Sequence, residues 1–151
     1  MELFIEGGHP LSGEVEISGA KNSVLPLICA SILSETPTCI KNVPNLSDVE
    51  NLLKILRSMN ADVQWDKEKK EVIIDARNIQ NIEVDHELVR KLRASFLIVG
   101  ALIGKFGEIK FPFPGGCNIG QRPVDLHLKA FETMGIKHRI QGGYIHFSGN
   151  L

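Results

Sequence analysis

Cysteine, aromatic residues and an excess of basic charge are all scarce in this sequence. The three cysteines show no Cys-x-x-Cys spacing and the histidines no His-x-x-x-His spacing, which argues against a zinc site. There is one tryptophan and one tyrosine, and no basic stripe is interleaved with aromatic residues. The formal net charge of −1 also lacks the basic footprint of a general nucleic-acid binder. We therefore expect no metal site and no nucleic-acid partner.

Long hydrophobic runs and targeting signals are absent too. The longest apolar stretch, 96–103, contains Gly100 and is too short to span a bilayer. The first residues show no basic region followed by an apolar core, so we expect no signal peptide. The composition, 43% hydrophobic and 23% charged, is ordinary for a globular protein. We expect a cytoplasmic protein without membrane insertion, with Cys29 and Cys39 as small buried hydrophobic residues.

The chain contains an internal repeat. Each copy reads as an apolar helix, a strand, a second helix and two strands joined by a tight turn. Ala30 aligns with Ala101 and Met59 with Met134, so the offset between the two copies grows along the chain. About four residues are therefore inserted in the later copy, between its first strand at 109–111 and its second helix, which starts at Val124. An insertion in one copy is typical of a scaffold that carries a site on a loop.

We assign the two copies to residues 21–77 and 78–151. The first helix of each copy is apolar nearly all round, so we expect it to be buried inside, with the amphipathic second helix outside. Two short strands are expected before the repeat, at 3–5 and 14–17, within an opening segment of residues 1–20.

The inserted loop holds Cys117 among glycines. Glycines free backbone N–H groups to face a ligand, and Pro123 suits the first turn of a helix. A helix start favours an anion, and a thiol held there beside Arg122 should ionise more readily than a free one. The stretch therefore predicts a reactive cysteine beside an anion pocket, suited to a phosphorylated or carboxylated substrate.

Other candidate residues lie where the predicted helices start. Lys21 precedes the first buried helix, where a cation opposes the helix dipole, so we favour an anion contact over a merely solvated lysine. Asn22 is compatible with a ligand contact or with an N-cap. Arg93 holds nearly the equivalent place in the second copy, although Arg90 near it keeps a solvated charge run open. Asp125 could simply cap its own helix.

Three separated motifs resemble the UDP-N-acetylglucosamine 1-carboxyvinyltransferases: Gly-Glu-Val-Glu-Ile-Ser-Gly-Ala-Lys-Asn at 13–22, Leu-Arg-Ala-Ser at 92–95, and the loop with its helix start at 114–127. The resemblance covers essentially the whole chain. It implies an α/β (α+β) fold, an inverted barrel built of repeated βαβαββ units. This chain would hold two of the three units of one domain, and residues 1–20 would belong to the other domain. The chain would then be an N-terminal part of a longer enzyme.

The resemblance also implies a reaction. Enolpyruvyl passes from phosphoenolpyruvate to the 3′-hydroxyl of UDP-N-acetylglucosamine with release of phosphate, by addition and elimination and without a cofactor, as the first committed step of peptidoglycan synthesis. Cys117 matches the proton donor and fosfomycin target, and Lys21 and Asn22 match phosphoenolpyruvate contacts. Arg93 matches a contact to the UDP-sugar. A run of five residues matches the segment that holds the UDP part in these enzymes: Arg122, Pro123, Val124, Asp125 and Leu126. Arg122 also matches a position near the phosphate.

Several alternatives stay open at this point. The sister 5-enolpyruvylshikimate-3-phosphate synthases share the fold but lack the Gly-Gly-Cys-x-Ile-Gly loop. A cysteine hydrolase would need a histidine base near Cys117, and no sequence signature supports one. A third alternative is a non-catalytic UDP-sugar-binding fragment, or a half that needs a complementing C-terminal half. Phosphate release would distinguish the enzyme from the binding module.

Overall fold

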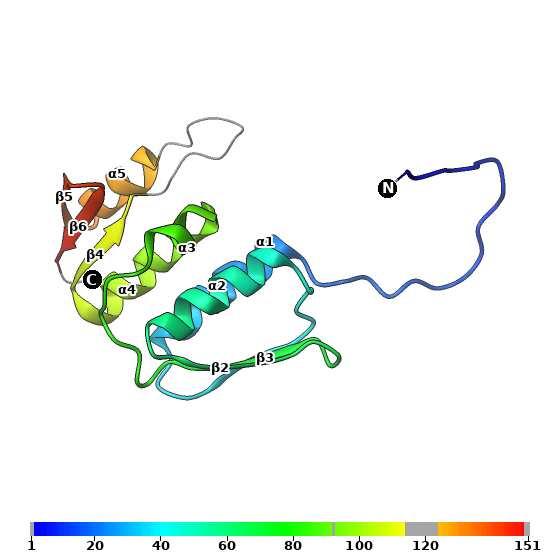
Figure 1. Cartoon of the computed structure of the whole chain (residues 1–151), viewed down its shortest axis with the longest axis horizontal. Coiled ribbons are helices and arrows are strands. Elements are labelled where there is room, and N and C mark those ends of the chain that lie inside the picture. Colours follow the sequence, from blue (N-terminus) through cyan, green and yellow to red (C-terminus); the bar gives the residue numbers. More distant parts are fainter. Residues whose placement is uncertain (1, 92, 114–123, 150–151) are drawn as a thin grey trace.

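The computed structural model describes residues 2–91, 93–113 and 124–149, with the backbone alone at residues 90, 91 and 93. After an extended N-terminal segment, the order helix, strand, helix, strand, strand occurs twice, and α3 and η2 precede the second occurrence (Figure 1). In chain order they are α1 (Lys21–Ala30), η1 (Ser31–Leu33), β1 (Thr38–Ile40), α2 (Ser47–Ser58), β2 (Asp62–Asp66), β3 (Glu71–Asp75), α3 (His86–Lys91), η2 (Arg93–Leu97), α4 (Ile98–Phe106), β4 (Glu108–Pro112), α5 (Asp125–Thr133), β5 (Lys137–Gln141) and β6 (Tyr144–Ser148).

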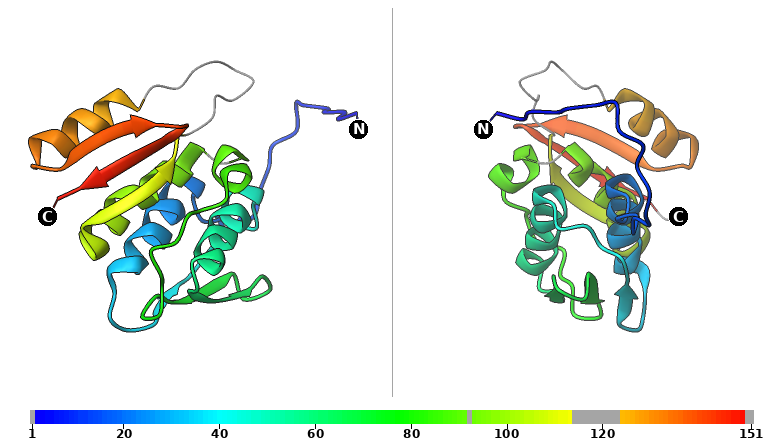
Figure 2. Two further views of the ribbon diagram at one scale, coloured as in Figure 1. Left: turned by 60° about the vertical axis from the view of Figure 1, so that its left-hand side comes forward. Right: turned by 90° about the vertical axis from the view of Figure 1, so that its right-hand side faces the viewer.

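Two antiparallel sheets enclose the helices. The strand orders are β1-β3-β2 and β4-β6-β5, so the last strand of each unit pairs between the other two. The registers correspond as well: Val72 of β3 lies opposite Ile40, and Ile145 of β6 lies opposite Phe111. Helices α1 to α4 lie between the sheets, with α5 beside the second one (Figures 1 and 2). The predicted α/β fold with repeated units is confirmed, in an inverted arrangement with helices inside and sheets outside.

The core lies on the inner face of each sheet. On β3, Val72 and Ile74 are fully buried, whereas Ile73 between them is 41% exposed on the outer face. On β4 and β6 the inward residues Phe111 and Phe147 are likewise buried. Alternation along the strand therefore turns each sheet's apolar side toward the helices, as the two-residue period of a strand requires.

The two helices of the first unit differ from expectation in how they are covered. The spacing of Val49, Leu52 and Leu56 correctly predicted the apolar face of α2, since all three are fully buried. However, α2 lies on the same side of its sheet as α1, not outside it (Figure 2). Helix α1 is not buried all round, because Leu27 is 53% exposed. Both expectations assumed that each sheet is covered on both faces, whereas these sheets form the outer layers.

Further expectations also need correction. The segment 2–20 contains no strand, although strands were expected at 3–5 and 14–17: its side chains are almost all exposed, and no described residue pairs with its backbone as a strand partner. A strand needs a neighbouring strand to satisfy its backbone groups. Cys39 is exposed rather than buried, because it faces outward from β1, whereas Cys29 is buried as predicted. Helix α3 was not foreseen.

The contact between the units is made chiefly by α4, which packs against α1 and η1. Lys105 of α4 joins the two units: its Nζ donates to the carbonyl oxygens of Ile32, at 2.8 Å, and Ala76, at 3.1 Å. Its stem is partly buried, so these bonds to a charged donor lie in a region of reduced solvent access. Lys105 therefore satisfies carbonyl groups in η1 and just after β3.

We expect Lys105→Met to lower the free energy of unfolding by about 1–3 kcal/mol, because two carbonyl groups lose a charged donor while the apolar stem is kept. Urea denaturation followed by circular dichroism would measure this. The exposed Lys129 offers a matched control, since Lys129→Met should change stability by no more than about 0.5 kcal/mol. Equal effects of the two substitutions would show that Lys105 does not join the units.

Candidate active site

The start of α1 is fixed by a close backbone approach at Gly19. A Cβ atom at this position would lie 1.8 Å from the carbonyl oxygen of Asn42, so no other residue fits without moving the backbone. Ala20 is the N-cap, and its carbonyl oxygen accepts from the N–H groups of Ser23 and Val24, each at 3.1 Å. Lys21 is thus the first residue of α1, and Gly19 decides where its side chain emerges.

Asn22 does not cap the helix, which removes one of its two expected roles. The N-cap is Ala20, and it makes no side-chain capping bond. Asn22 is the second helical residue and its side chain is exposed. Pro26 within α1 has no N–H, so the carbonyl of Asn22 also lacks the donor that an ordinary helix would supply. Asn22 therefore presents its polar groups to solvent beside Lys21.

Lys21 pairs with a carboxylate of the neighbouring helix. Its Nζ lies 2.8 Å from an Oδ atom of Asp48, with side chains 46% and 30% exposed. Asp48 lies in the first turn of α2, where the helix dipole favours a negative charge. The pair shows that the N-terminal ends of α1 and α2 lie side by side. Sequence reasoning missed Asp48, because only the packing of the two helices brings it to Lys21.

Arg93 holds nearly the equivalent position in the second unit. It begins η2, which contacts both α1 and α2. Its backbone is therefore placed on the same helical layer as Lys21, as the repeat predicted. The side chain of Arg93 lies outside the described residues, so its role as a contact to the UDP-sugar stays a prediction.

The start of α5 carries three more candidate residues. Val124 is the N-cap of α5 and is buried, at 7% exposed, so its side chain anchors the helix rather than facing solvent. Asp125 is the first helical residue and makes no capping bond, which corrects the view that it might cap its own helix. Leu126 is 75% exposed. His127 packs edge-on against Phe96 with ring centroids 5.5 Å apart, in keeping with a packing histidine.

Cys117, Arg122 and Pro123 lie outside the described residues. The chain before them is held by Phe113, whose N–H donates to the carbonyl of Gly143 at 2.8 Å. Val124, the next described residue after them, is buried. Their expected roles as proton donor, phosphate contact and part of the UDP-binding run remain predictions that the structure does not test.

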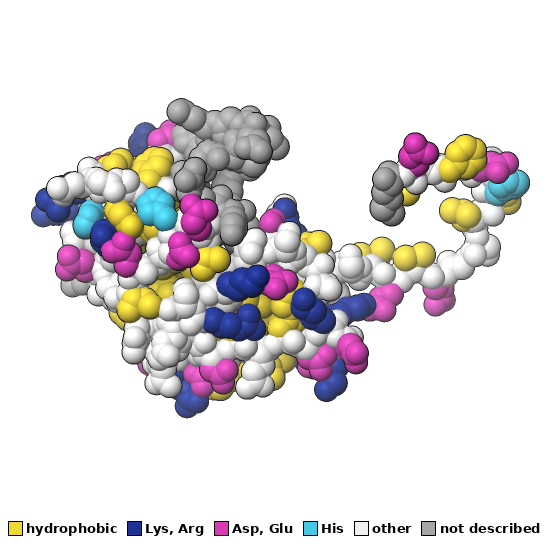
Figure 3. Space-filling view, viewed as in Figure 1, with side chains coloured by type: hydrophobic (Ala, Val, Ile, Leu, Met, Phe, Trp, Pro, Cys, Tyr) yellow, Lys and Arg dark blue, Asp and Glu magenta, His cyan; other side chains and the backbone are white. Residues whose placement is uncertain are grey.

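Charge elsewhere on the described surface is largely paired. Figure 3 shows Lys and Arg side chains over α2, where Lys54 and Lys67 pair with Glu50 and Arg57 donates to the carbonyl of Val63. Within the described ranges there is no group of three or more His, Cys, Asp or Glu that could hold a metal ion. In the same part of the chain, none of the helices combines the length and apolar character needed to cross a membrane.

A double-mutant cycle would decide whether Lys21 mainly serves the fold. For Lys21→Ala and Asp48→Ala, we expect a coupling free energy below about 1 kcal/mol, because Lys21 is exposed and Asp48 partly exposed, so water screens the pair. Chemical denaturation of the two single variants and the double variant measures it. A coupling above about 2 kcal/mol, near the upper end for residues in contact, would identify the lysine as a structural residue. A small coupling leaves its charge available to a ligand.

Comparisons with known proteins define the class. The family model for EPSP synthase (3-phosphoshikimate 1-carboxyvinyltransferase) matches residues 5–148. The chain therefore belongs to this family. The crystal structure of the enolpyruvyl transferase NikO from Streptomyces tendae matches with a TM-score of 0.78 at 24% sequence identity, covering 95% of this chain and 31% of that one. This likeness shows the enolpyruvyl transferase fold.

More similar relatives carry a narrower name. UDP-N-acetylglucosamine 1-carboxyvinyltransferase 2 of Clostridium tetani is 49% identical over 144 residues, covering 95% of this chain and 34% of the relative. UDP-N-acetylglucosamine 1-carboxyvinyltransferase of Halothermothrix orenii is 44% identical over 149 residues, covering 99% of this chain and 35% of the relative. The chain thus spans about a third of the length of the curated relatives it matches, and it aligns with part of each.

Proposed function

We propose that this chain is the N-terminal part of a UDP-N-acetylglucosamine 1-carboxyvinyltransferase, which transfers enolpyruvyl from phosphoenolpyruvate to the 3′-hydroxyl of UDP-N-acetylglucosamine and releases phosphate. The observation that carries this proposal is the high identity to relatives of that name across nearly the whole chain. The Gly-Gly-Cys-x-Ile-Gly loop, which the sister 5-enolpyruvylshikimate-3-phosphate synthases lack, supports it from the sequence. The reaction belongs to peptidoglycan precursor synthesis in the cytoplasm and needs no cofactor.

In the proposed reaction, this chain supplies the acid and the anion contacts. Cys117 donates a proton to the methylene carbon of phosphoenolpyruvate while the sugar oxygen attacks the neighbouring carbon, which gives a tetrahedral addition product. Lys21, Asn22 and Arg122 hold the phosphate and carboxylate groups, whose negative charge they stabilise at the ends of helices. Arg93 and the run 122–126 hold the UDP-sugar. Loss of a proton and of phosphate then yields the enol ether product, with the base supplied from outside this chain.

The acid role of Cys117 has a direct test. In the complete enzyme, Cys117→Ser should lower kcat by about 10²- to 10⁴-fold, the usual contribution of a general acid, and should abolish alkylation by fosfomycin. Phosphate release and mass spectrometry measure the two effects. Unchanged turnover together with full alkylation would show that the cysteine is neither the acid nor the target.

The charge of Lys21 has a second test. In the complete enzyme, Lys21→Ala should reduce kcat/KM for phosphoenolpyruvate by about 10²- to 10³-fold, because a cation that stabilises the transition state is lost. The free energy of unfolding should change by less than about 1 kcal/mol, since the Lys21–Asp48 pair is partly exposed to solvent. Lys21→Arg, which keeps the charge, is the matched control. An unfolded Lys21→Ala variant, or one with unchanged kinetics, would remove Lys21 from the site.

The binding-module alternative is decided by the 151-residue chain itself. UDP-sugar binding without phosphate release would favour a fragment or a half that needs a complementing chain.

We also propose that residues 1–20 pair as strands with the other domain of the complete enzyme. The exposed, alternating Leu3 and Ile5, at 77% and 79%, and Val15 and Ile17, at 83% and 78%, have the pattern of strands that lack a partner.

A further inference from the structure

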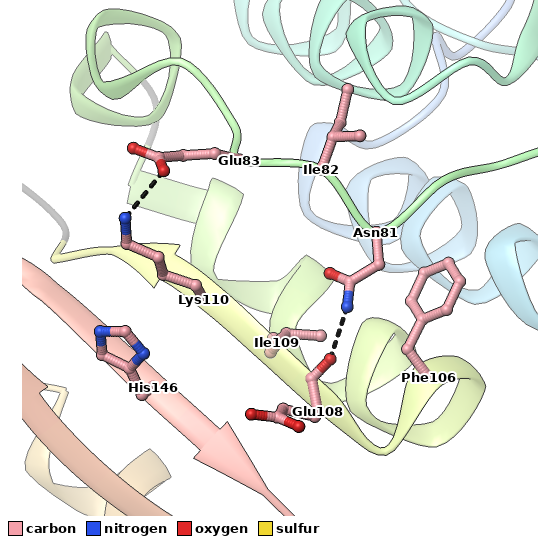
Figure 4. A pocket seen from close by; sticks show the side chains of 8 residues that line it. All are labelled: Asn81, Ile82, Glu83, Phe106, Glu108, Ile109, Lys110 and His146. Carbon is pink, nitrogen blue, oxygen red and sulfur yellow. Dashed lines mark hydrogen bonds and ion pairs between the residues drawn. The ribbon is translucent and has the colours of Figure 1, made fainter.

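The second sheet has one covered edge and one open edge. At the covered edge, residues 81–83 lie along β4, where the side chain of Asn81 donates to the carbonyl oxygen of Glu108 at 2.7 Å (Figure 4). Glu83 of the same segment pairs with Lys110 of β4, also at 2.7 Å. This edge shows how the sheet holds a neighbouring segment: by a hydrogen bond to the backbone of the strand and by a carboxylate beside an outward-facing cation.

The open edge is β5, the strand on the other side of β6. Within the described ranges, no segment pairs with the side of β5 that faces away from β6. In an antiparallel pair, residues alternate between exchanging hydrogen bonds with the partner strand and pointing their backbone groups away from it. Half of the backbone groups of β5 are therefore without a strand partner, and such an edge can accept one more strand.

Two cations on β5 lack the kind of partner that Lys110 has. Lys137 and Arg139 are exposed on the outer face of the sheet, on either side of the half-buried His138. Among the Lys and Arg side chains that the structure describes, only these two and Lys129 of α5 make neither an ion pair nor a hydrogen bond. Unpaired positive charge therefore lies along the open edge.

The repeat shows that the fold does not require these cations. The equivalent edge strand of the first unit is β2, where Asp62 and Gln64 hold the places of Lys137 and Arg139 and are exposed as well. Charged side chains on an edge strand keep two like edges from pairing, because the charges repel. They do not repel a strand of opposite charge. The cations of β5 therefore favour an acidic neighbour and disfavour the same edge of a second copy.

The inner face of β5 carries an apolar side chain that is only partly covered. Ile140 lies opposite the fully buried Ile145 of β6, so it belongs to the inner face, yet it is 54% exposed. A strand added beside β5 would place its inward residues next to Ile140 and its outward residues next to Lys137 and Arg139. A strand that fits this edge therefore alternates apolar and acidic residues.

We propose that the open edge of β5 binds a partner protein through an extended segment of alternating acidic and apolar residues, which is added to the sheet as a further strand. Its carboxylates pair with Lys137 and Arg139, as Glu83 pairs with Lys110 at the covered edge. In this mode of binding, main-chain hydrogen bonds give affinity and the side chains give specificity. None of the candidate active-site residues lies on β5, so the proposal does not rest on the proposed function.

Binding of a labelled peptide tests the proposal. Fluorescence anisotropy would follow a fluorescein-labelled peptide of alternating glutamate and valine, added to the 151-residue chain and to the complete enzyme. Both proteins should bind it, more weakly as salt is added, and a peptide with lysine in place of glutamate should not bind. In hydrogen-exchange mass spectrometry, the bound peptide should slow the exchange of amides in residues 137–141, which ionic attraction alone would not do.

Matched variants separate this edge from general attraction of negative charge. The double substitution Lys137→Gln and Arg139→Gln should weaken peptide binding by about 3- to 30-fold, the effect of losing two exposed ion pairs. Lys129→Gln removes the remaining unpaired cation, which lies on α5, and should change the affinity by less than about twofold. Equal effects of the two changes would contradict the assignment to β5.

Other outcomes would also overturn the proposal. The absence of binding is one, and binding without slower exchange at 137–141 is another. Equally tight binding of a labelled oligothymidylate would show a surface that attracts any polyanion. Binding to the short chain alone would show that the rest of the polypeptide covers the edge. A mass of the short chain that doubles as its concentration rises, with slower exchange at 137–141 and no peptide, would show a second copy there. None of these readouts depends on phosphate release.

Discussion

The packing of α4 against α1 and η1 is the contact on which the arrangement of the chain depends. This contact joins the two units, in each of which helices cover one face of the sheet. It also buries apolar surface of the helices that neither unit could bury alone. Lys105 adds hydrogen bonds at the same contact, because its ammonium group donates to two carbonyl oxygens of the other unit. The candidate site follows from this contact, since it places α1, α2 and η2 in one helical layer.

The layering also explains why the candidate residues come from helix starts. Helices that start at the same end of a layer bring their unpaired N–H groups and the positive ends of their dipoles together. The Lys21–Asp48 pair shows that α1 and α2 start side by side in this way. A rigid scaffold with such an end can hold anionic groups without any metal ligand. The part of the proposed chemistry that this chain supplies needs cations and one acid, which suits this architecture.

Periodicity predicted the fold well where one face of an element is apolar. The spacing of Val49, Leu52 and Leu56 identified the buried face of α2, and the repeat predicted the order of the strands along the chain. It could not show which layer lies outside, so the exposures of Leu27 and Cys39 were missed. Nor could it show Asp48 as the partner of Lys21, because that pairing depends on how two helices pack.

The fit of Gly19 against Asn42 has a mechanical consequence. Residues 2–18 leave the helical layer from a point that the backbone contact clamps in place, only two residues before Lys21. Because this contact holds the backbone just before α1, a change in the direction of residues 2–18 need not move the first turn of the helix. The position of the Lys21 ammonium group is then set by α1 and Asp48 and not by the course of the segment before Gly19.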